Sequence, residues 1–574
     1  MIDLISAIPF LKNAAPETLA EIEDAADWYS LPGGWALFEA GAAADALYIV
    51  LSGRLAAFRR NEDGTEELIG YIGAGEPAGE MALIAGEPHS ASVYALRDTE
   101  MLRVPEAAFH RLSRAHPRLM QQLSRIMLLR ARAARRGANP ARPTVFALIA
   151  TSPSIEIESL ARDLAGRVNT MGRSCAVIGV EDKDKDAAFF DTVLHKHDVV
   201  LMPVRMGDAD WYRTALRQAD RMWVFARRDA RPSKPMPMTP DANSPARRFR
   251  LVDLVLMQYG ASDAATPAEW IDAVDSARLF RWRTDTDADC LARVIAGKSV
   301  GLVLSGGGAR AYAHIGAVRA LREFGLPFDL AGGTSMGGII AAGVALGWSD
   351  DEMDDRIRRA FVSSNPLGDH NLPVVALTRG GRVEERLAEN FRDIRIEDLN
   401  TPYFCVSSDL VSGEVYVHRT GFLRDALRAS IALPGVLPPV ATEGRVLVDG
   451  AVLNNLPTNV MQTLNTGPIV AVDVARQGRL NPADFVDPPN FLGWVLEHGV
   501  SQPPPIISLL IRSATVHVNP WENRAHTDLL IAPKLEGIDI REWRSYDKAV
   551  AAGYEATVKA LEEAPPDLRA LVGR

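Results

Sequence analysis

The sequence predicts a multidomain α/β protein, because three segments of different residue pattern follow one another along its 574 residues. Residues 8–134 read as short strands with turn signals, followed by helices. Between about 144 and 285, apolar runs of strand length alternate with helical stretches, which is typical of a parallel α/β sheet. From about 288 onward the alternation continues, now with glycine-rich loops after the strands. At roughly 100–200 residues per domain, the length fits three or four domains.

The first segment predicts a β-roll with helices. Residues 45–60 and 61–77 predict two strands joined by an Asp-Gly turn, and 90–105 predict two more. Residues 106–135 then carry apolar positions at helical spacing and predict a helix pair. A stretch rich in Gly, Pro and small residues at 135–143 predicts a linker. The expected domains are therefore 1–136, 143–287 and 288–574.

Composition narrows the class of protein. A net charge of -10 provides no basic footprint for phosphates and argues against a nucleic-acid partner. The three cysteines, Cys175, Cys290 and Cys405, are far apart and form no CxxC, which excludes a zinc finger or disulfide framework and favours a reducing compartment. Neither a signal-peptide pattern nor an apolar run of the ~18 residues a membrane span needs is visible. We expect a cytoplasmic protein, with any membrane contact peripheral and at the inner face.

The stretch 333–337 reads Gly-Thr-Ser-Met-Gly and lies between an apolar strand and an apolar helix. This is the context that a G-x-S-x-G nucleophile elbow requires. Small neighbours allow the strained serine conformation and close backbone passage, and the following helix directs its positive end at a developing alkoxide. Ser335 is the candidate nucleophile.

Three consecutive glycines, Gly306, Gly307 and Gly308, follow the predicted strand 300–304 and precede a helix. Amides exposed at such a point serve a phosphate or an oxyanion. The Gly-Lys-Ser/Thr ending of a Walker A loop and the G-x-G-x-x-G of a dinucleotide fold are both missing. With a nucleophile elbow downstream, an oxyanion hole is favoured over a helix start without a role.

Asp449 opens an Asp-Gly-Ala sequence directly after the apolar strand Arg-Val-Leu-Val. An aspartate at the carboxyl end of a strand lies where α/β sheets place functional groups. It follows Ser335 by 114 residues, 449 minus 335. Taken alone, the motif would be an ordinary Asp-Gly turn.

These three motifs resemble, in order and spacing, those of the patatin-like phospholipases. The resemblance implies a catalytic dyad in which Asp449 accepts the proton of Ser335 directly. It assigns the oxyanion hole to the amides of the three glycines. The reaction that it implies needs neither a metal nor a cofactor. Arg310 fills the family's basic loop position, either near a lipid phosphate or in a structural ion pair.

Residues 314–337, 428–440 and 447–461 resemble the neuropathy target esterase branch of that family. This branch hydrolyses lysophospholipids and related acyl esters, and joins cyclic-nucleotide-binding-like domains to the hydrolase. The resemblance covers nearly the whole chain. It implies a serine esterase that cleaves lysophospholipids or phospholipids under the influence of an N-terminal sensor, with a C-terminal α/β hydrolase domain built on a parallel central sheet.

Two other functions stay open. His498, His517 and His526 all follow Asp449, so a Ser-Asp-His esterase or thioesterase on small acyl substrates fits the chain order. A ligand-controlled binding protein with a vestigial hydrolase is the second alternative. His314, on the helix after the glycine loop, is expected to be a packed or capping residue.

Residues 78–100 resemble the phosphate-binding cassette of cyclic-nucleotide-binding domains. Gly79 and Glu80 match, the glutamate as partner of the ribose 2′-OH, and Ser90 matches a phosphate-contacting position. His89 replaces the arginine that pairs with the cyclic phosphate, and a neutral imidazole lacks the bidentate fork of a guanidinium. The fold is therefore expected, whereas the missing arginine argues against a cyclic nucleotide as ligand.

Two apolar stretches broken by prolines, 431–440 and 503–513, could line an acyl groove or touch a lipid interface, although core packing is slightly favoured for each. The middle segment resembles a Rossmann- or P-loop-like α/β linker. It lacks a Walker motif, so we expect a scaffold or interaction surface without NTPase activity.

Overall fold

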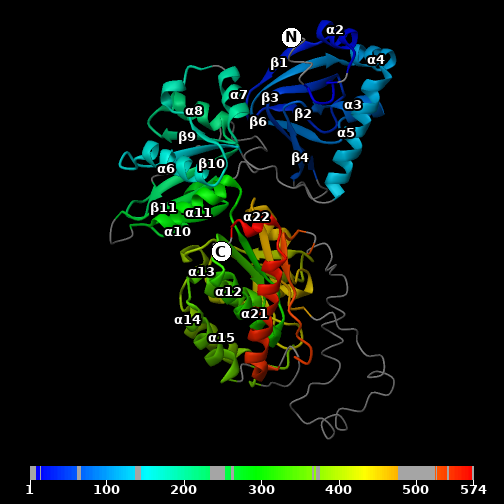
Figure 1. Cartoon of the computed structure of the whole chain (residues 1–574). Coiled ribbons are helices and arrows are strands. Elements are labelled where there is room, and N and C mark those ends of the chain that lie inside the picture. Colours follow the sequence, from blue (N-terminus) through cyan, green and yellow to red (C-terminus); the bar gives the residue numbers. More distant parts are fainter. Residues whose placement is uncertain are drawn as a thin grey trace, which may run out of the picture. The chain divides into compact units, whose positions relative to one another are not determined.

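The computed structural model describes most of the chain, in two compact units, Met1–Ala296 and Gly297–Arg574 (Figure 1). Each unit is described by itself. The expected three-domain division stays a prediction. The described residues are 8–12, 14–60, 66–135, 144–185, 187–232, 252–259, 264–364, 367–369, 375–475, 524, 526–538 and 542–571.

The first unit begins with a mainly antiparallel sheet and helices, as the sequence predicts for a β-roll. The predicted pair of strands within 90–105 is wrong, because β6 runs through this stretch without a break and bulges against β3 instead of turning back. The strands are β1 (Asp27–Leu31), β2 (Ala36–Phe38), β3 (Ala46–Arg60), β4 (Glu66–Gly73), β5 (Pro77–Ala78) and β6 (Ser92–Pro105). The helices are α2 (Pro16–Ala25), α3 (Glu80–Ala85), α4 (Glu106–Ala115) and α5 (Pro117–Arg135).

A second sheet in this unit is parallel throughout, with strand order β12-β11-β10-β7-β9-β8. Its strands are apolar on both faces because helices cover both sides. The last helix, α11, packs against α6 and so belongs to this unit. The strands are β7 (Val145–Ala150), β8 (Cys175–Val177), β9 (Val199–Arg205), β10 (Arg221–Arg227), β11 (Val252–Met257) and β12 (Arg278–Trp282). The helices are α6 (Ile157–Thr170), α7 (Ala187–Lys196), α8 (Ala209–Gln218), α10 (Pro267–Val274) and α11 (Asp285–Ala296).

The second unit is built on a mixed sheet whose central strands β15, β14, β13, β19 and β20 are parallel, in that order. Three antiparallel strands complete it at the β15 end. The strands are β13 (Gly301–Leu304), β14 (Leu330–Thr334), β15 (Tyr403–Asp409), β16 (Val415–His418), β17 (Val440–Thr442), β18 (Arg445–Asp449), β19 (Ile469–Val472) and β20 (Leu529–Ile531). The helices are α12 (Ala313–Glu323), α13 (Met336–Leu346), α14 (Asp350–Ile357), α15 (Gly381–Phe391), α16 (Leu423–Ser430), α17 (Thr458–Leu464), α21 (Tyr546–Glu562) and α22 (Pro566–Arg569).

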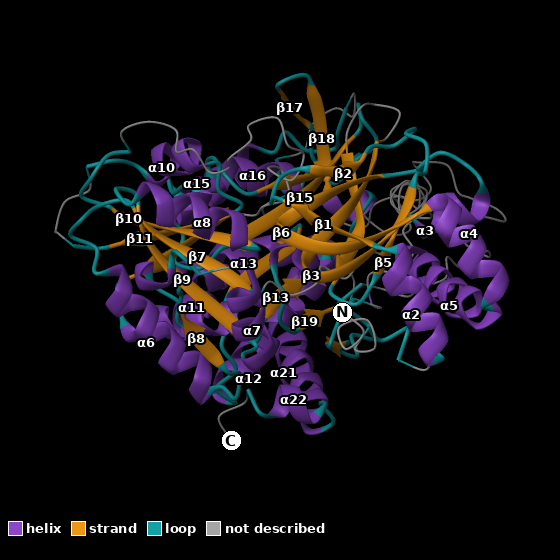
Figure 2. Cartoon of the chain, turned by 90° about the horizontal axis from the view of Figure 1, so that it is seen from above, coloured by secondary structure: helices purple, strands orange, loops and turns teal. Residues whose placement is uncertain are grey.

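Strand β15 has different partners along its two edges. Cys405 to Ser408 pair with β16 on one edge. On the other edge β14 pairs as far as Val406, opposite Thr334, and β18 takes over at Ser407. The chain therefore leaves β14 at the level where β18 arrives, at the carboxyl edge of the parallel strands. Figure 2 shows β15 beside β18, with the β17–β18 hairpin projecting from this sheet.

Helix α12, which follows the glycine-rich loop after β13, lies along α21 near the end of the chain (Figure 1). The two helices touch through glycines. A Cβ on Gly316 would overlap the Val550 carbonyl and lie 2.8 Å from the Tyr554 nitrogen, and a Cβ on Gly553 would overlap Ala313. Backbone contact of this kind leaves no room for a side chain, so α12 and the loop before it are fixed against α21.

We expect Gly316→Ala to lower the free energy of unfolding by about 1–3 kcal/mol, because the added methyl must push α21 away. Gly166→Ala is the matched control. Gly166 also lies inside a helix, but a Cβ there meets open space, so this change should raise stability by roughly 0.5–1 kcal/mol. Urea unfolding of both variants measures the difference. A stabilising Gly316→Ala would contradict the close packing.

Candidate active site

Ser335 sits at the turn between β14 and α13, as the elbow motif predicts. Its backbone has φ 54° and ψ -129°, a conformation that costs energy in any residue with a Cβ. The structure around it is dense, because ten residues of α13 are buried. Gly337 is part of this fit: a Cβ there would overlap the carbonyls of Leu304 and Ser305 at the end of β13. The glycines thus let the elbow pass directly over β13.

Asp449 ends β18 and meets the serine side chain. Ser335 Oγ donates a hydrogen bond to Asp449 Oδ2 over 2.7 Å, and the Ala451 amide donates to Oδ1 over 2.9 Å. Both side chains are buried, at 8% and 3% exposure. Desolvation raises the pKa of Asp449 to about 6, because these two hydrogen bonds compensate its burial only in part. The two predicted residues, 114 positions apart in sequence, are therefore brought into direct contact.

The three glycines of the loop after β13 differ in what their amides do. The Gly306 amide donates to the Asn455 carbonyl over 3.2 Å, whereas no described residue accepts from the amides of Gly307 and Gly308. Gly306 is the point of closest approach to the nucleophile, since a Cβ there would lie 3.2 Å from the Ser335 Cβ. The Met336 amide, at the first position of α13, also has no acceptor among the described residues. Free amides therefore lie on both segments that flank Ser335.

Arg310 points into the protein. It is 7% exposed, and its guanidinium donates to the carbonyls of Val474, Leu535 and Ile538 over 2.8–3.0 Å. These contacts tie the glycine loop to the segments after β19 and β20. Of the two predicted roles, this geometry favours a structural one over contact with a lipid phosphate.

Histidines make no hydrogen bond to Ser335 or Asp449 within the described part of the chain. His314 is fully buried and donates from Nε2 to the Ser305 carbonyl over 2.8 Å, and burial lowers its pKa to about 4. The predicted packed histidine is confirmed. Of the triad candidates, His526 is partly buried, and His498 and His517 lie outside the described residues.

Two residues that support the site were not singled out from sequence. Ser430, the last residue of α16, accepts from the Ser335 amide over 3.0 Å and donates to the Val406 carbonyl. Asn455 exchanges hydrogen bonds with the main chain of Gly306. Both lie inside the stretches 428–440 and 447–461, so the signal was present, but only the fold brings their side chains to the elbow.

The stretch 431–440 packs mainly as core, as slightly favoured from sequence, with Ile431, Ala432, Val436 and Leu437 buried. Its Ala432 carbonyl accepts from the Asp449 amide. The other candidate acyl stretch, 503–513, lies outside the described residues.

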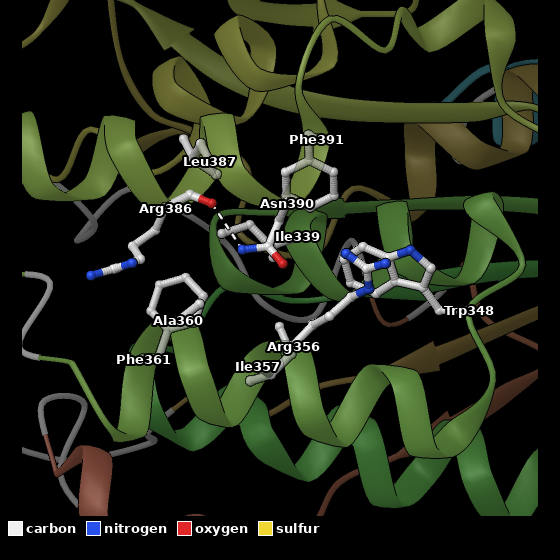
Figure 3. A pocket seen from close by; sticks show the side chains of 10 residues that line it. All are labelled: Ile339, Trp348, Arg356, Ile357, Ala360, Phe361, Arg386, Leu387, Asn390 and Phe391. Carbon is white, nitrogen blue, oxygen red and sulfur yellow. Dashed lines mark hydrogen bonds between the residues drawn. The ribbon is translucent and has the colours of Figure 1, made fainter.

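A separate apolar pocket opens beside α13, one helical turn beyond Ser335. Figure 3 shows Ile339, Trp348 and Phe391 in its wall, with Arg356 and Arg386 also lining it.

In the first unit, the glutamate of the predicted nucleotide cassette is bound by a side chain of the protein itself. Gly79 has φ 84° and directly precedes α3, and Glu80 is buried and accepts from Arg130 Nη1 of α5 over 2.7 Å. Burial raises the pKa of Glu80 even with this cation beside it. His89 is also buried and stacks on Phe38, with ring centroids 3.6 Å apart. Ser90 is exposed.

Comparison with known proteins finds one matching domain family in each unit. The profile of the patatin-like phospholipases matches residues 302–461, and that of the cyclic nucleotide-binding domain matches 29–116. An uncharacterized NTE family protein of Mycobacterium tuberculosis is 32% identical, over 98% of this chain and 96% of that protein. The human patatin-like phospholipase domain-containing protein 6 is 27% identical, over 86% of this chain and 41% of that protein.

Among solved structures, the catabolite activator protein of Thermus thermophilus is 27% identical over 28% of this chain and 67% of that chain, with a TM-score of 0.21. No helix within the described residues is both long enough and apolar enough to span a bilayer. Because the Mycobacterium tuberculosis relative matches nearly the whole chain, this chain belongs to the NTE family. It joins a cyclic nucleotide-binding domain to a carboxylic ester hydrolase of the patatin-like phospholipase type.

Proposed function

We propose that Ser335 and Asp449 are a two-residue catalytic dyad that hydrolyses the acyl ester bonds of lysophospholipids or phospholipids. The observation that carries this proposal is the 2.7 Å hydrogen bond from Ser335 Oγ to a buried carboxylate. The accepting atom of a general base must lie within about 2.6–3.2 Å of the atom that carries the proton, and Asp449 Oδ2 meets this requirement without an intermediate histidine. The phospholipase-type family supports the ester substrate class.

In the first half of the reaction, Ser335 Oγ attacks the ester carbonyl carbon while its proton moves to Asp449 Oδ2. The tetrahedral intermediate collapses, the bond to the glycerol oxygen breaks, and that oxygen takes the proton from Asp449. The products are an acyl-enzyme and a deacylated alcohol. In the second half, water attacks the acyl carbon, Asp449 takes one water proton, and the fatty acid leaves as Ser335 regains its hydrogen.

The raised pKa of Asp449 suits this exchange. A carboxylate of ordinary pKa is a weak base toward a serine hydroxyl, and desolvation narrows the gap between the two groups. The same dry surroundings strengthen any hydrogen bond to the oxyanion. For the oxyanion hole predicted at Gly306, Gly307 and Gly308, the uncommitted amides of Gly307 and Gly308 are the stronger donors, and the Gly306 amide is held by Asn455.

For the sensor, we propose that α5 closes the cassette without a cyclic nucleotide. Glu80, the expected ribose partner, already has a charged partner in Arg130. His89 offers a neutral ring, since burial lowers its pKa. A ligand would have to break the Glu80–Arg130 pair and gain no guanidinium–phosphate pair from position 89 in return. Any control of the hydrolase by this domain would then depend on another signal.

We expect Ser335→Ala and Asp449→Asn each to reduce fatty-acid release from lysophosphatidylcholine by at least about a thousandfold, because each removes one member of a unit that acts together. A fluorophosphonate probe should label the parent protein and fail to label Ser335→Ala. Retained activity in purified, folded Ser335→Ala would refute the assignment.

The matched controls are His498→Ala, His517→Ala and His526→Ala. Each should keep the parent rate within about twofold, because the dyad has no place for a third group. A loss in any one of them as deep as that of Ser335→Ala would replace the dyad with a triad, and a panel of short esters and thioesters would then define the substrate.

Asp449 should also leave a pH signature. Its folded pKa of about 6 lies above the unfolded value of about 3.9, so the folded state binds its proton more tightly and the free energy of unfolding falls as pH rises between the two values. Asp449→Asn removes this cost. The variant should be more stable than the parent by about 3 kcal/mol at pH 8 and equal to it below about pH 4.

The parent's ester hydrolysis should rise with pH through about 6 as the base loses its proton. Urea unfolding at several pH values and a pH-rate profile measure both, and a stability difference that is the same at both pH values would contradict the buried base.

Cyclic AMP and cyclic GMP should bind more weakly than about 1 mM and leave the hydrolysis rate unchanged, because Arg130 holds Glu80 and position 89 carries no guanidinium. Isothermal titration calorimetry and rate measurements test this with the full chain. Saturable binding that Glu80→Gln abolishes would show instead that the cassette works as a nucleotide site.

A further inference from the structure

The loop between β15 and β16 carries exposed aliphatic side chains at its turn. Leu410 and Val411 are 55% and 64% exposed, although such turn positions ordinarily hold polar residues or glycine. Leu453, four residues after Asp449, is 37% exposed, and its amide donates to Ser408 Oγ on β15. We call Leu410, Val411 and Leu453 the aliphatic tip.

The aliphatic tip lies at the same edge of the sheet as the dyad. β14 ends opposite Val406, and β15 continues for three more residues to Asp409 before the turn. At about 3.3 Å per residue, the turn stands roughly 10 Å beyond the level at which the chain turns into Ser335. The Leu410 amide donates to the Val446 carbonyl of β18, the strand that ends in Asp449. Leu410 and Val411 thus follow β15 and are tied to β18, whereas Leu453 follows the end of β18 and is tied back to β15.

Hydrogen bonds hold this turn in one shape. Asp409 accepts from the Val411 amide over 3.0 Å through Oδ1 and from the Ser412 hydroxyl through Oδ2. Its carbonyl accepts from the Gly413 amide, and its own amide donates to the Glu414 carbonyl. Because the amides of Leu410 and Val411 both have acceptors within the protein, these two residues can enter an apolar medium without uncovering their own backbone donors.

The charges around the tip are acidic on balance. Asp409 and Glu443 both pair with Arg445, and Glu414 lies on the same turn, so these four residues carry a formal charge of -2. Arg445 is engaged with both Asp409 and Glu443. Attraction to anionic lipids would need basic residues that are not already paired with carboxylates, so this charge balance favours an apolar contact.

We propose that the aliphatic tip inserts into the surface of a zwitterionic phospholipid bilayer or micelle and presents the dyad to the lipid layer. The inference rests on the proposed phospholipase function and deepens it by naming the surface that meets aggregated substrate. A lipid ester reaches Ser335 from an aggregate, and apolar side chains at the active-site edge gain free energy there that they lack in water.

The test uses the full chain carrying Ser335→Ala, so that vesicles stay intact during the measurement. Co-flotation with phosphatidylcholine vesicles should show binding, and the added changes Leu410→Ser and Val411→Ser should weaken the partition by about tenfold or more. Phe422→Ser is the matched control: it is 38% exposed in the same unit but precedes α16, whose other end at Ser430 touches Ser335. It should bind as the parent does.

Several results would overturn the inference. These are a tip variant that partitions like the parent, binding that disappears at high salt, and binding that requires phosphatidylglycerol. Self-association of the parent that the tip changes abolish would identify the tip as a contact between copies of the chain instead. Failure of the phospholipase proposal appears separately, as hydrolysis that survives Ser335→Ala.

A second measurement tests the same inference if the serine variants fold poorly. Val411→Cys and Phe422→Cys, each labelled with a polarity-sensitive fluorophore, keep the rest of the turn and share the same three native cysteines. Phosphatidylcholine vesicles should shift the emission of the label at position 411 to the blue and leave that at 422 unchanged. Equal spectra at the two positions would contradict insertion.

Discussion

One edge of β15 is shared by two strands that run in opposite directions, and the candidate active site depends on this arrangement. β14 pairs up to Val406, and Asp449 of β18 pairs at Ser407, the next residue. Two chain segments that end at adjacent positions of one edge must bring their terminal side chains together. Ser335 and Asp449 meet for this reason, and the 2.7 Å hydrogen bond follows from strand register rather than from local sequence.

Holding the dyad in this place requires energetically unfavourable features. Ser335 adopts a positive φ, and Asp449 loses its hydration without gaining a cation. Both are held by dense surroundings, which include the wholly buried core of α13 and the main-chain contacts of Ser430, Asn455 and Arg310. Strain and desolvation at a site that the rest of the fold over-determines are typical of catalytic centres, because they hold reacting groups in position and shift their pKa values.

The cassette of the cyclic nucleotide-binding domain shows the opposite case. Glu80, which was expected to bind a ligand, instead forms an ion pair within the protein. Glu80 is buried as in a nucleotide site, but Arg130 from α5 neutralises it, and Phe38 covers the ring of His89. A buried carboxylate needs a partner, and a helix of the same chain supplies one. In the second unit, by contrast, the buried carboxylate of Asp449 has only the Ser335 hydroxyl and the Ala451 amide as hydrogen-bond partners among the described residues.

The sequence by itself determined the α/β class and the strands that carry the motifs, and it pointed to Ser335 and Asp449 as candidate residues, because short-range patterns such as a glycine-flanked serine after a strand are written in consecutive residues. It did not determine that β6 runs on through a predicted turn, since bulges against β3 depend on a distant partner. Nor did it show that the Gly306 amide donates to the Asn455 carbonyl, that Arg310 faces inward, or that the Leu410 amide pairs with β18, the strand that ends in Asp449. Those features depend on which strands become neighbours, and only the tertiary structure decides that, because pairing joins residues whose separation in sequence carries no local signal.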